Sequence, residues 1–270
     1  MTQTGSGALL AQLIAAHDDD AQIAQPAARP ASLEEAYRIA DRLAQARSAA
    51  VGGWAGWKVG ATSAPAQKFL GVTEPIRGRM PRSGIVEAPI SVAARPGLEA
   101  EPEIILRLKD DFDGRKPPRT TAEAYEMIDE ARVGVELVRP AYAAPFDAGA
   151  LCIVADNAAH QGLVLGLAMR EAERSALDEI AVALTKNGQK AGEGVSSVVL
   201  DHPLNALVWL ARSFAATEEP LAPGSWVATG SICRAVSLEE GDYLVADFGA
   251  AGRVEITAQS GPPRRAGDAS

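Results

Sequence analysis

Three glutamates inside apolar, β-prone segments constrain the fold of this chain more than any other feature. Glu101 and Glu103 lie in the run Glu101–Leu106, and Glu136 lies in Val133–Val138. Side chains two residues apart on a strand point to the same face, so Glu101 and Glu103 are expected side by side. Two carboxylates that close repel and raise one another's pKa. A hard divalent cation with oxygen ligands would neutralise them, and a solvated strand face is the alternative explanation.

The bulk composition predicts a globular cytoplasmic protein without a nucleic-acid or membrane partner. Of the 270 residues, 47% are apolar, which is enough for a full core. The net charge is −9 with Lys and Arg scattered, which argues against nucleic acid and anionic membranes. No apolar run has the length of a bilayer span, and the N-terminus lacks the pattern of a secretory signal. Cys152 and Cys233 are interpreted as buried free thiols in a reducing cytoplasm.

Sequence texture divides the chain after Gly52-Gly53, where a helical pattern gives way to short β-prone runs cut by Gly and Pro. Strands outnumber helices and do not alternate with them regularly, which predicts an α+β fold with a mixed or antiparallel sheet and helices outside. The expected parts are an N-terminal helical segment packing on the core (1–53), a catalytic β-rich domain (54–258) and a disordered tail (259–270).

Local patterns predict the individual elements. Capping patterns at Ser32 and Thr120 mark the starts of two helices. The predicted helices are Ala8–His17, Ser32–Ala49, Thr120–Ala131 and Pro203–Phe214. The predicted strands include Val133–Val138, Leu151–Val154, Leu163–Leu167, Tyr243–Ala246 and Arg253–Ile256. Asn187-Gly188 is a strong signal for a hairpin turn.

Lys58 and Asp156 are candidates for catalysis beside the glutamates. Lys58 lies between two apolar residues of a predicted strand, either as an edge charge or as a buried cation that binds a substrate carboxylate or moves a proton. Asp156 and Asn157 directly follow an apolar segment, where they form a turn or where Asp156 orients Lys58 or a metal-bound water.

Hydroxyl and imidazole groups add weaker candidates. Thr229-Gly230-Ser231 could offer a hydroxyl and backbone N–H groups to a carboxylate. His17 is expected in solvent and His202 in a structural hydrogen bond at a helix start, so His160, close to Asp156, is the histidine weighed for acid–base work. The sequence contains no readable Ser-His-Asp or Cys-His grouping and no phosphate-binding glycine loop.

Taken in order, these segments resemble the fumarylacetoacetate hydrolase superfamily. Within it they are most similar to the 2-hydroxypenta-2,4-dienoate (2-keto-4-pentenoate) hydratase and 4-oxalocrotonate decarboxylase branch. The resemblance covers roughly residues 30 to 258 in collinear order. The matching segments are Trp57–Ser63, Glu74–Met80, Glu101–Ile104, Val135–Val138, Ala155–Ala158, Lys186–Gly188, His202–Ala211 and Ala228–Ser231.

The resemblance implies a mixed, highly curved β-sheet roll with flanking helices. It also implies a magnesium or manganese ion held by Glu101, Glu103 and Glu136, with Lys58 and Asp156 as catalytic residues. The implied substrate contacts are Asn157, Lys186, Thr229 and Ser231. Members of the family suggest a homo-oligomer that acts on a small 2-keto or 2-hydroxy acid.

The implied activity is that of a metal-dependent lyase, a hydratase of a 2-hydroxy-2,4-dienoate in aromatic catabolism. A 2-keto acid can chelate a metal, which then stabilises the negative charge that forms when a proton moves at C3. The same electron sink serves two other reactions. A 4-oxalocrotonate-type decarboxylase and an acylpyruvate C–C hydrolase therefore remain alternatives.

The sequence departs from the branch pattern beside the proposed metal centre. Arg82-Ser83 stand where an Asp is usual, Ala159-His160 replace small hydroxyl residues, and Arg139-Pro140 replace Ser-Arg. Arg79 and Arg82 would favour a diacid substrate if they pointed toward the metal. The missing Asp also keeps open a non-catalytic partner subunit of the same fold.

Overall fold

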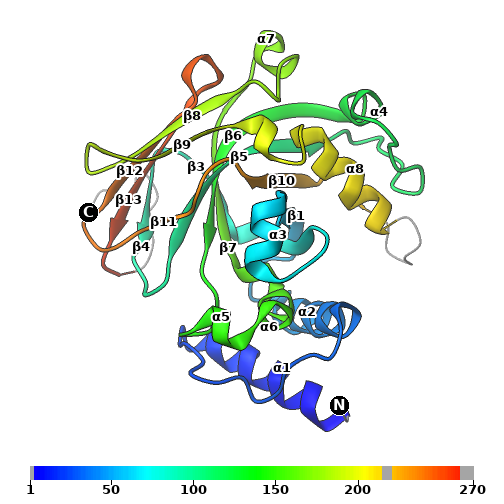
Figure 1. Ribbon diagram of the computed structural model, residues 1–270, viewed down its shortest axis with the longest axis vertical. Helices are drawn as coiled ribbons and strands as arrows, with labels where there is room; N and C mark the ends of the chain where they lie inside the picture. The colour runs from blue at the N-terminus through cyan, green and yellow to red at the C-terminus, as the bar shows by residue number, and fades with distance from the viewer. Residues whose placement is uncertain (1–2, 215–220, 262–270) are drawn as a thin grey trace.

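Residues 3–214 and 221–261 are described by the computed structural model, whose body consists of two β-sheets (Figure 1). The larger sheet is mixed, and its edge strand β2 curls round to contact β7. In spatial order its strands are β2 (Ile76–Pro81), β1 (Trp54–Gly60), β10 (Trp226–Ser231), β5 (Glu99–Leu108), β6 (Ile128–Val138), β7 (His160–Ala168) and β3 (Ile85–Glu87), with β11 (Val236–Ser237) paired to β5. The predicted curved, mixed sheet with flanking helices is confirmed.

The smaller sheet lies beside this roll and has five strands. They are β4 (Ile90–Ala93), β13 (Arg253–Gln259), β12 (Tyr243–Asp247), β8 (Ala181–Lys186) and β9 (Gln189–Val195). The predicted hairpin turn joins β8 to β9, with Asn187 and Gly188 at φ 54° and 76°, as a type I′ turn requires. Of the tail predicted from residue 259, Gln259 belongs to β13, and residues 262–270 lie outside the described part of the chain.

Alternation along β5 creates two interiors. Ile104 and Leu106 point to one face and join the main core, which the second sheet and helix α8 (Pro203–Phe214) cover. Glu103 and Ile105 point to the other face, inside the roll. There, Ile105 belongs to a smaller apolar cluster with Met80, Leu163, Leu165 and Ala228. The curvature of the sheet thus places the glutamate face in a buried interior.

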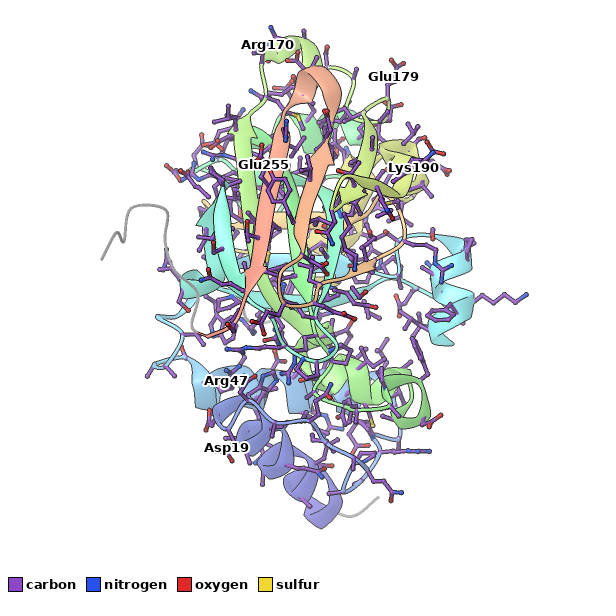
Figure 2. All side chains as sticks on the ribbon, turned by 90° about the vertical axis from the view of Figure 1, so that its left-hand side faces the viewer. Asp19, Arg47, Arg170, Glu179, Lys190 and Glu255 are labelled. Carbon is purple, nitrogen blue, oxygen red and sulfur yellow. The ribbon has the colours of Figure 1, made fainter. Side chains whose placement is uncertain are left out.

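The helices group around the sheets. The remaining ones are α1 (Gln3–Asp18), α2 (Leu33–Arg47), α3 (Ala64–Leu70), α4 (Thr121–Tyr125), α5 (Pro145–Ala148), α6 (Ala150–Ala155) and α7 (Glu171–Arg174). Helices α1 and α2 lie with α5 and α6 at one end of the molecule in both views (Figures 1 and 2). They share a separate core that includes Leu9, Leu13, Ile39, Leu43 and Val154. None of the described helices is long and apolar enough to cross a bilayer.

The predicted helix Thr120–Ala131 is wrong in length. Its start is correct, because the Thr120 hydroxyl accepts a hydrogen bond from the Glu123 N–H at 3.1 Å. The helix ends at Tyr125, however, and β6 begins at Ile128, where the chain pairs with β5. Pairing along β5 overrides the local helix preference.

The predicted strand Leu151–Val154 is a helix. Residues Ala150–Ala155 form α6, and its apolar side chains are buried against α2. A short, wholly apolar run fits a buried strand and a buried helix equally well, so its sequence could not distinguish them. Two other predicted helix starts hold: the Ser32 hydroxyl caps α2, and His202 accepts a hydrogen bond from the Leu204 N–H at the start of α8. The first helix starts earlier than predicted, at Gln3 instead of Ala8.

Candidate metal centre and its surroundings

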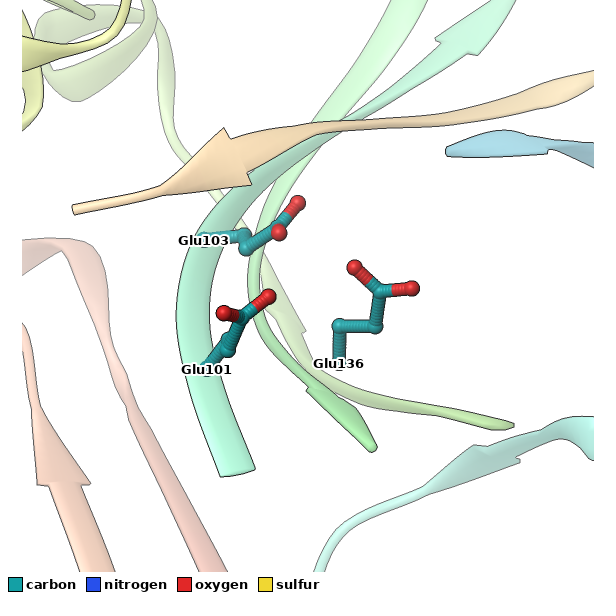
Figure 3. Close-up of side chains that lie close together, drawn as sticks. All are labelled: Glu101, Glu103 and Glu136. Carbon is teal, nitrogen blue, oxygen red and sulfur yellow. The ribbon is translucent and has the colours of Figure 1, made fainter. Parts of the chain in front are cut away.

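Three carboxylates from two neighbouring strands converge inside the roll. Glu101 and Glu103 project from β5, and Glu136 projects from β6 directly opposite Glu101 (Figure 3). One carboxylate oxygen from each lies within 4.8 Å of the other two. Glu103 and Glu136 are buried, whereas Glu101 is partly exposed. The strand period brings the first two together, and the β5–β6 register adds the third.

The electrostatics of this cluster are unfavourable without a cation. Burial raises the pKa of Glu101 to about 7. The charge of Lys58 lowers this pKa and the charge of Glu136 raises it, but burial has the largest effect. Burial and the other two glutamates also raise the pKa of Glu103 well above its usual value. Burial raises the pKa of Glu136 too, but Lys58 and His160 outweigh it and leave this pKa below its usual value. Full ionisation of all three therefore requires more positive charge than Lys58 supplies.

Hydrogen bonding leaves room for a cation at two of the glutamates. Glu103 accepts a hydrogen bond from the Gly230 N–H through Oε2 at 2.8 Å, while its Oε1 is buried and has no hydrogen bond in the described chain. Glu136 likewise has a buried Oε2 without a hydrogen bond. Buried oxygens left without donors are costly. Carboxylate oxygens of this kind suit Mg²⁺, Mn²⁺ or Ca²⁺, so the residues present fit a hard divalent cation.

Lys58 is a buried cation, and the alternative of an edge charge is wrong. Its Nζ lies 3.3 Å from Glu136 Oε2, and the residue is 4% exposed. Burial alone lowers the pKa of Lys58, but the three glutamates together raise this pKa above its usual value. The ammonium group therefore stays charged beside the cluster and is available to an anionic ligand.

His160, the histidine weighed for acid–base work, lies in this site and contacts one of the glutamates. Its buried Nδ1 lies 2.7 Å from Glu136 Oε1, because β7 begins at His160 alongside Val138 of β6. Asp156 is four residues from His160 in sequence but has other hydrogen-bond partners, Ala141 and His17. The only available signal was the departure of His160 from the family pattern, which does not identify a contact.

Asp156 faces away from the expected partner. Its Oδ2 accepts a hydrogen bond from the Ala141 N–H at 2.6 Å, and its Oδ1 lies 2.7 Å from His17 Nε2. The expectation that Asp156 orients Lys58 is corrected, since both of its oxygens are occupied elsewhere. His17 was expected in solvent, but its side chain is only 9% exposed. The pair joins α1 to the end of α6.

Thr229 and Ser231 use their hydroxyls within the fold. Thr229 Oγ1 donates to the Ile104 carbonyl at 2.9 Å, and Ser231 Oγ donates to the Cys233 carbonyl at 2.6 Å. The contribution of this segment to the cluster is the backbone N–H of Gly230, which binds Glu103. Substrate contacts by the two hydroxyls stay a prediction.

Asn157 and Lys186 also have structural partners. The Asn157 amide both accepts from the Arg79 N–H at 2.6 Å and donates to the Arg79 carbonyl at 2.8 Å. Lys186 lies on β8 of the other sheet, where its Nζ is 3.1 Å from Asp242. The side chain of Lys186 is thus engaged with Asp242 and not with the three glutamates in the described chain, and a substrate-binding role for either residue stays a prediction.

The two arginines proposed to favour a diacid point elsewhere. Arg79 lies over the ring of Trp57 at 4.4 Å and pairs with Asp41 at 3.1 Å. Trp57 precedes Lys58 on β1 and so faces the opposite side of the sheet from the glutamates. Arg82 is exposed and donates to the Trp54 carbonyl. Neither arginine therefore supports a diacid substrate.

The cysteines take no part in a disulfide. Cys152 is buried, and Cys233 is partly buried near the cluster. Burial, with a smaller contribution from Glu101, raises the pKa of Cys233 to about 11. The thiol is therefore neutral near pH 7 and a poor nucleophile.

Comparison with known proteins identifies the family of this roll. The family described as fumarylacetoacetate (FAA) hydrolase C-terminal matches residues 60–259. The chain belongs to the fumarylacetoacetate hydrolase family. It is 31% identical to 2-hydroxyhexa-2,4-dienoate hydratase of Comamonas testosteroni, over 78% of this chain and 80% of the relative. It is 28% identical to 2-keto-4-pentenoate hydratase of Paraburkholderia xenovorans, over 85% of each chain.

Solved structures have the same fold as this chain. A 4-oxalocrotonate decarboxylase from Pseudomonas putida G7, complexed with magnesium and adipate, superposes with a TM-score of 0.83 at 24% identity. That match covers 96% of this chain and 98% of the other. The resemblance therefore extends beyond the matched roll and includes the N-terminal helices.

Proposed function

We propose that this chain is a metal-dependent lyase that hydrates a 2-hydroxy-2,4-dienoate, a substrate class of aromatic catabolism. The observation that carries the proposal is the convergence of three glutamate carboxylates beside a buried lysine inside the roll. Membership of the fumarylacetoacetate hydrolase family supports it. The hydratases at 28% and 31% identity support the reaction type.

The residues proposed to hold the metal are Glu101, Glu103 and Glu136. Glu103 Oε1 and Glu136 Oε2 make no hydrogen bond in the described chain, and the Lys58 ammonium lies 3.3 Å from the second of these oxygens. Magnesium or manganese fits such carboxylate oxygens. When bound, the cation supplies a Lewis acid that stabilises negative charge developing on the 2-oxygen of the substrate.

Lys58 supplies the positive charge of the chain itself at this site. Its ammonium group is buried and rigidly placed 3.3 Å from Glu136, so it can bind the substrate carboxylate or hand a proton to the reacting carbon chain. Ile105 and Leu163 belong to an apolar cluster inside the same roll. Electrostatic interactions are stronger in a buried, largely apolar environment than in bulk water.

A hydratase is favoured over a decarboxylase of a diacid by the positions of the arginines. The second carboxylate of a diacid needs a cation at the far end of the substrate. Arg79 and Arg82 were the candidates for this contact, and both have partners away from the glutamates. A 4-oxalocrotonate decarboxylase of Pseudomonas putida is 29% identical over 74% of this chain, so sequence similarity alone does not separate the two activities.

The deciding experiment compares two substrates with the purified chain. Loss of the dienoate chromophore is followed with 2-hydroxypentadienoate and with 4-oxalocrotonate, each with Mg²⁺ and with a chelator. The proposal expects rapid, magnesium-dependent loss with 2-hydroxypentadienoate and little reaction with 4-oxalocrotonate. Faster release of carbon dioxide from 4-oxalocrotonate would establish the decarboxylase instead. Binding of Mg²⁺ without turnover of either compound would favour a non-catalytic partner subunit.

The cellular setting and assembly form part of the same proposal. The free thiols Cys152 and Cys233 support a reducing cytoplasm. The family resemblance supports a homo-oligomer. Light scattering of the purified chain tests this, and a monomer at micromolar concentration would contradict it.

A further inference from the structure

We propose that His160 is a positioning residue that restricts Glu136 to a single metal-binding oxygen and thereby sets the preference of the centre for a small cation. The inference rests on the proposed metal centre. His160 lies at the start of β7, and its side chain is completely buried against Glu136.

The direction of the hydrogen bond follows from the chemistry of the two groups. Glu136 Oε1 belongs to a carboxylate, which can only accept, so His160 Nδ1 carries the hydrogen across the 2.7 Å separation. Val138 of β6 pairs with His160, and the side chains of His160 and Glu136 are both fully buried, so there is little room for the ring to turn away. The imidazole holds Oε1 in place.

Holding Oε1 decides what Glu136 can offer to a cation. Oε2 remains without a hydrogen bond, and its nearest cationic neighbour is Lys58 Nζ at 3.3 Å. Glu103 shows the same arrangement, with Oε2 held by the Gly230 N–H and Oε1 free of hydrogen bonds. Two glutamates on adjacent strands thus each present one oxygen, and each keeps the other oxygen engaged with the protein.

One oxygen per carboxylate favours a small ion. Mg²⁺ takes six ligands in a strict octahedron and accepts single carboxylate oxygens, whereas Ca²⁺ takes six to eight and often binds both oxygens of a carboxylate. A donor that occupies Oε1 therefore disfavours the two-oxygen mode that Ca²⁺ uses. Loss of the donor would free Glu136 to rotate and to bind with both oxygens.

Binding isotherms for Mg²⁺ and Ca²⁺ test the inference on four proteins, without substrate. His160→Leu removes the donor at similar volume, and His160→Asn returns an N–H close to the position of Nδ1. His17→Leu is the matched control, because it also removes a buried histidine–carboxylate contact of 2.7 Å, but at Asp156. Thermal unfolding of each variant shows that the protein is folded at the temperature of the isotherm.

His160→Leu is expected to weaken Mg²⁺ binding by about 10- to 100-fold, the usual effect of losing a group that orients a metal ligand. The ratio of Mg²⁺ to Ca²⁺ affinity should fall in the same variant. His160→Asn should restore most of the Mg²⁺ affinity and most of the preference for Mg²⁺. His17→Leu should change the melting temperature but neither affinity. Unchanged Mg²⁺ binding and preference in His160→Leu would overturn the inference, as would equal losses in the Asn and Leu variants. If the unmodified chain binds neither ion, the metal centre itself is refuted, which is a distinguishable result.

Discussion

Two buried histidine–carboxylate pairs in this protein have the same contact distance but different surroundings. His160 Nδ1 lies 2.7 Å from Glu136, and His17 Nε2 lies 2.7 Å from Asp156. Asp156 has its second oxygen bound by the Ala141 N–H, so its hydrogen bonding is complete. Glu136 has a second oxygen with no hydrogen bond, among two other buried or partly buried carboxylates.

The difference separates a structural carboxylate from one that can bind a ligand. A fully bonded, buried carboxylate stabilises the fold because its loss leaves donors without partners. A carboxylate with one unbonded oxygen beside like charges costs stability until a cation arrives. The first kind should respond to mutation through stability, and the second through binding and catalysis.

The largest effect is expected for Glu103→Gln. The amide can still accept from the Gly230 N–H but loses the negative charge that a cation requires. We expect kcat/KM to fall by about 10³-fold or more, since Lewis-acid stabilisation contributes several kcal/mol. The metal-free variant should melt at the same or a higher temperature, because the amide has no charged form that would be costly to bury beside the other two glutamates. A clear loss of thermal stability together with normal Mg²⁺ binding would contradict the distinction.

Asp156→Asn should show the opposite pattern. The amide keeps only one acceptor oxygen, so either His17 or the Ala141 N–H loses its partner, which costs about 3 kcal/mol of unfolding free energy. Mg²⁺ affinity should stay within about threefold of that of the original chain, because the two oxygens of Asp156 contact His17 and Ala141 and not the three glutamates. Urea unfolding and calorimetric titration measure the two quantities. Loss of Mg²⁺ binding in a folded variant would restore the catalytic role that the sequence predicted for Asp156.

The metal-free protein should lose stability as the pH rises from about 5 to 8. The pKa of Glu101 is raised to about 7 in the folded chain from its usual 4.5, so the folded state holds this proton more tightly than the unfolded state. The stabilising contribution is complete below pH 4.5 and disappears as the pH passes 7. Allowing for partial exposure, about 2 kcal/mol is at stake.

Two controls isolate this effect from other titrating groups. Glu101→Gln removes the titrating carboxyl group, and saturating Mg²⁺ stabilises the ionised carboxylate of the original chain. The variant and the added Mg²⁺ should each flatten the decline of the melting temperature with pH. The same decline in Glu101→Gln as in the original chain would show that another group is responsible.

The smallest effect is expected for Arg79→Met. Arg79 stacks on Trp57 and pairs with Asp41 on the opposite side of the sheet from the glutamates. Loss of the stacked cation should cost about 1 kcal/mol of stability. The ratio of kcat/KM for 2-hydroxypentadienoate and 4-oxalocrotonate should change by less than about twofold, as for other sites outside the substrate contacts. A selective change in the diacid rate would return Arg79 to the substrate site.

The sequence by itself determined the local features of this protein. The pairing of Glu101 with Glu103 on one face follows from the two-residue period of a strand, and the turn at Asn187-Gly188 follows from its backbone preferences. Helix starts at Ser32 and Thr120 depend on neighbours three residues away. Collinear segments were enough to indicate the family, because their order carries more information than any one of them.

Tertiary structure alone decided which partner each buried polar group meets. His17 and Asp156 are 139 residues apart, and His160 reaches Glu136 only because β6 pairs with β7, with a register shift between Leu137 and Val138. Pairing of β6 with β5 shortened the helix predicted after Thr120, and packing against α2 made Leu151–Val154 helical. Local propensities differ by less than about 1 kcal/mol per residue, whereas strand pairing and core burial act over many residues at once. Three glutamates could thus be read as a candidate cluster from the sequence, but the oxygens left open to a cation could not.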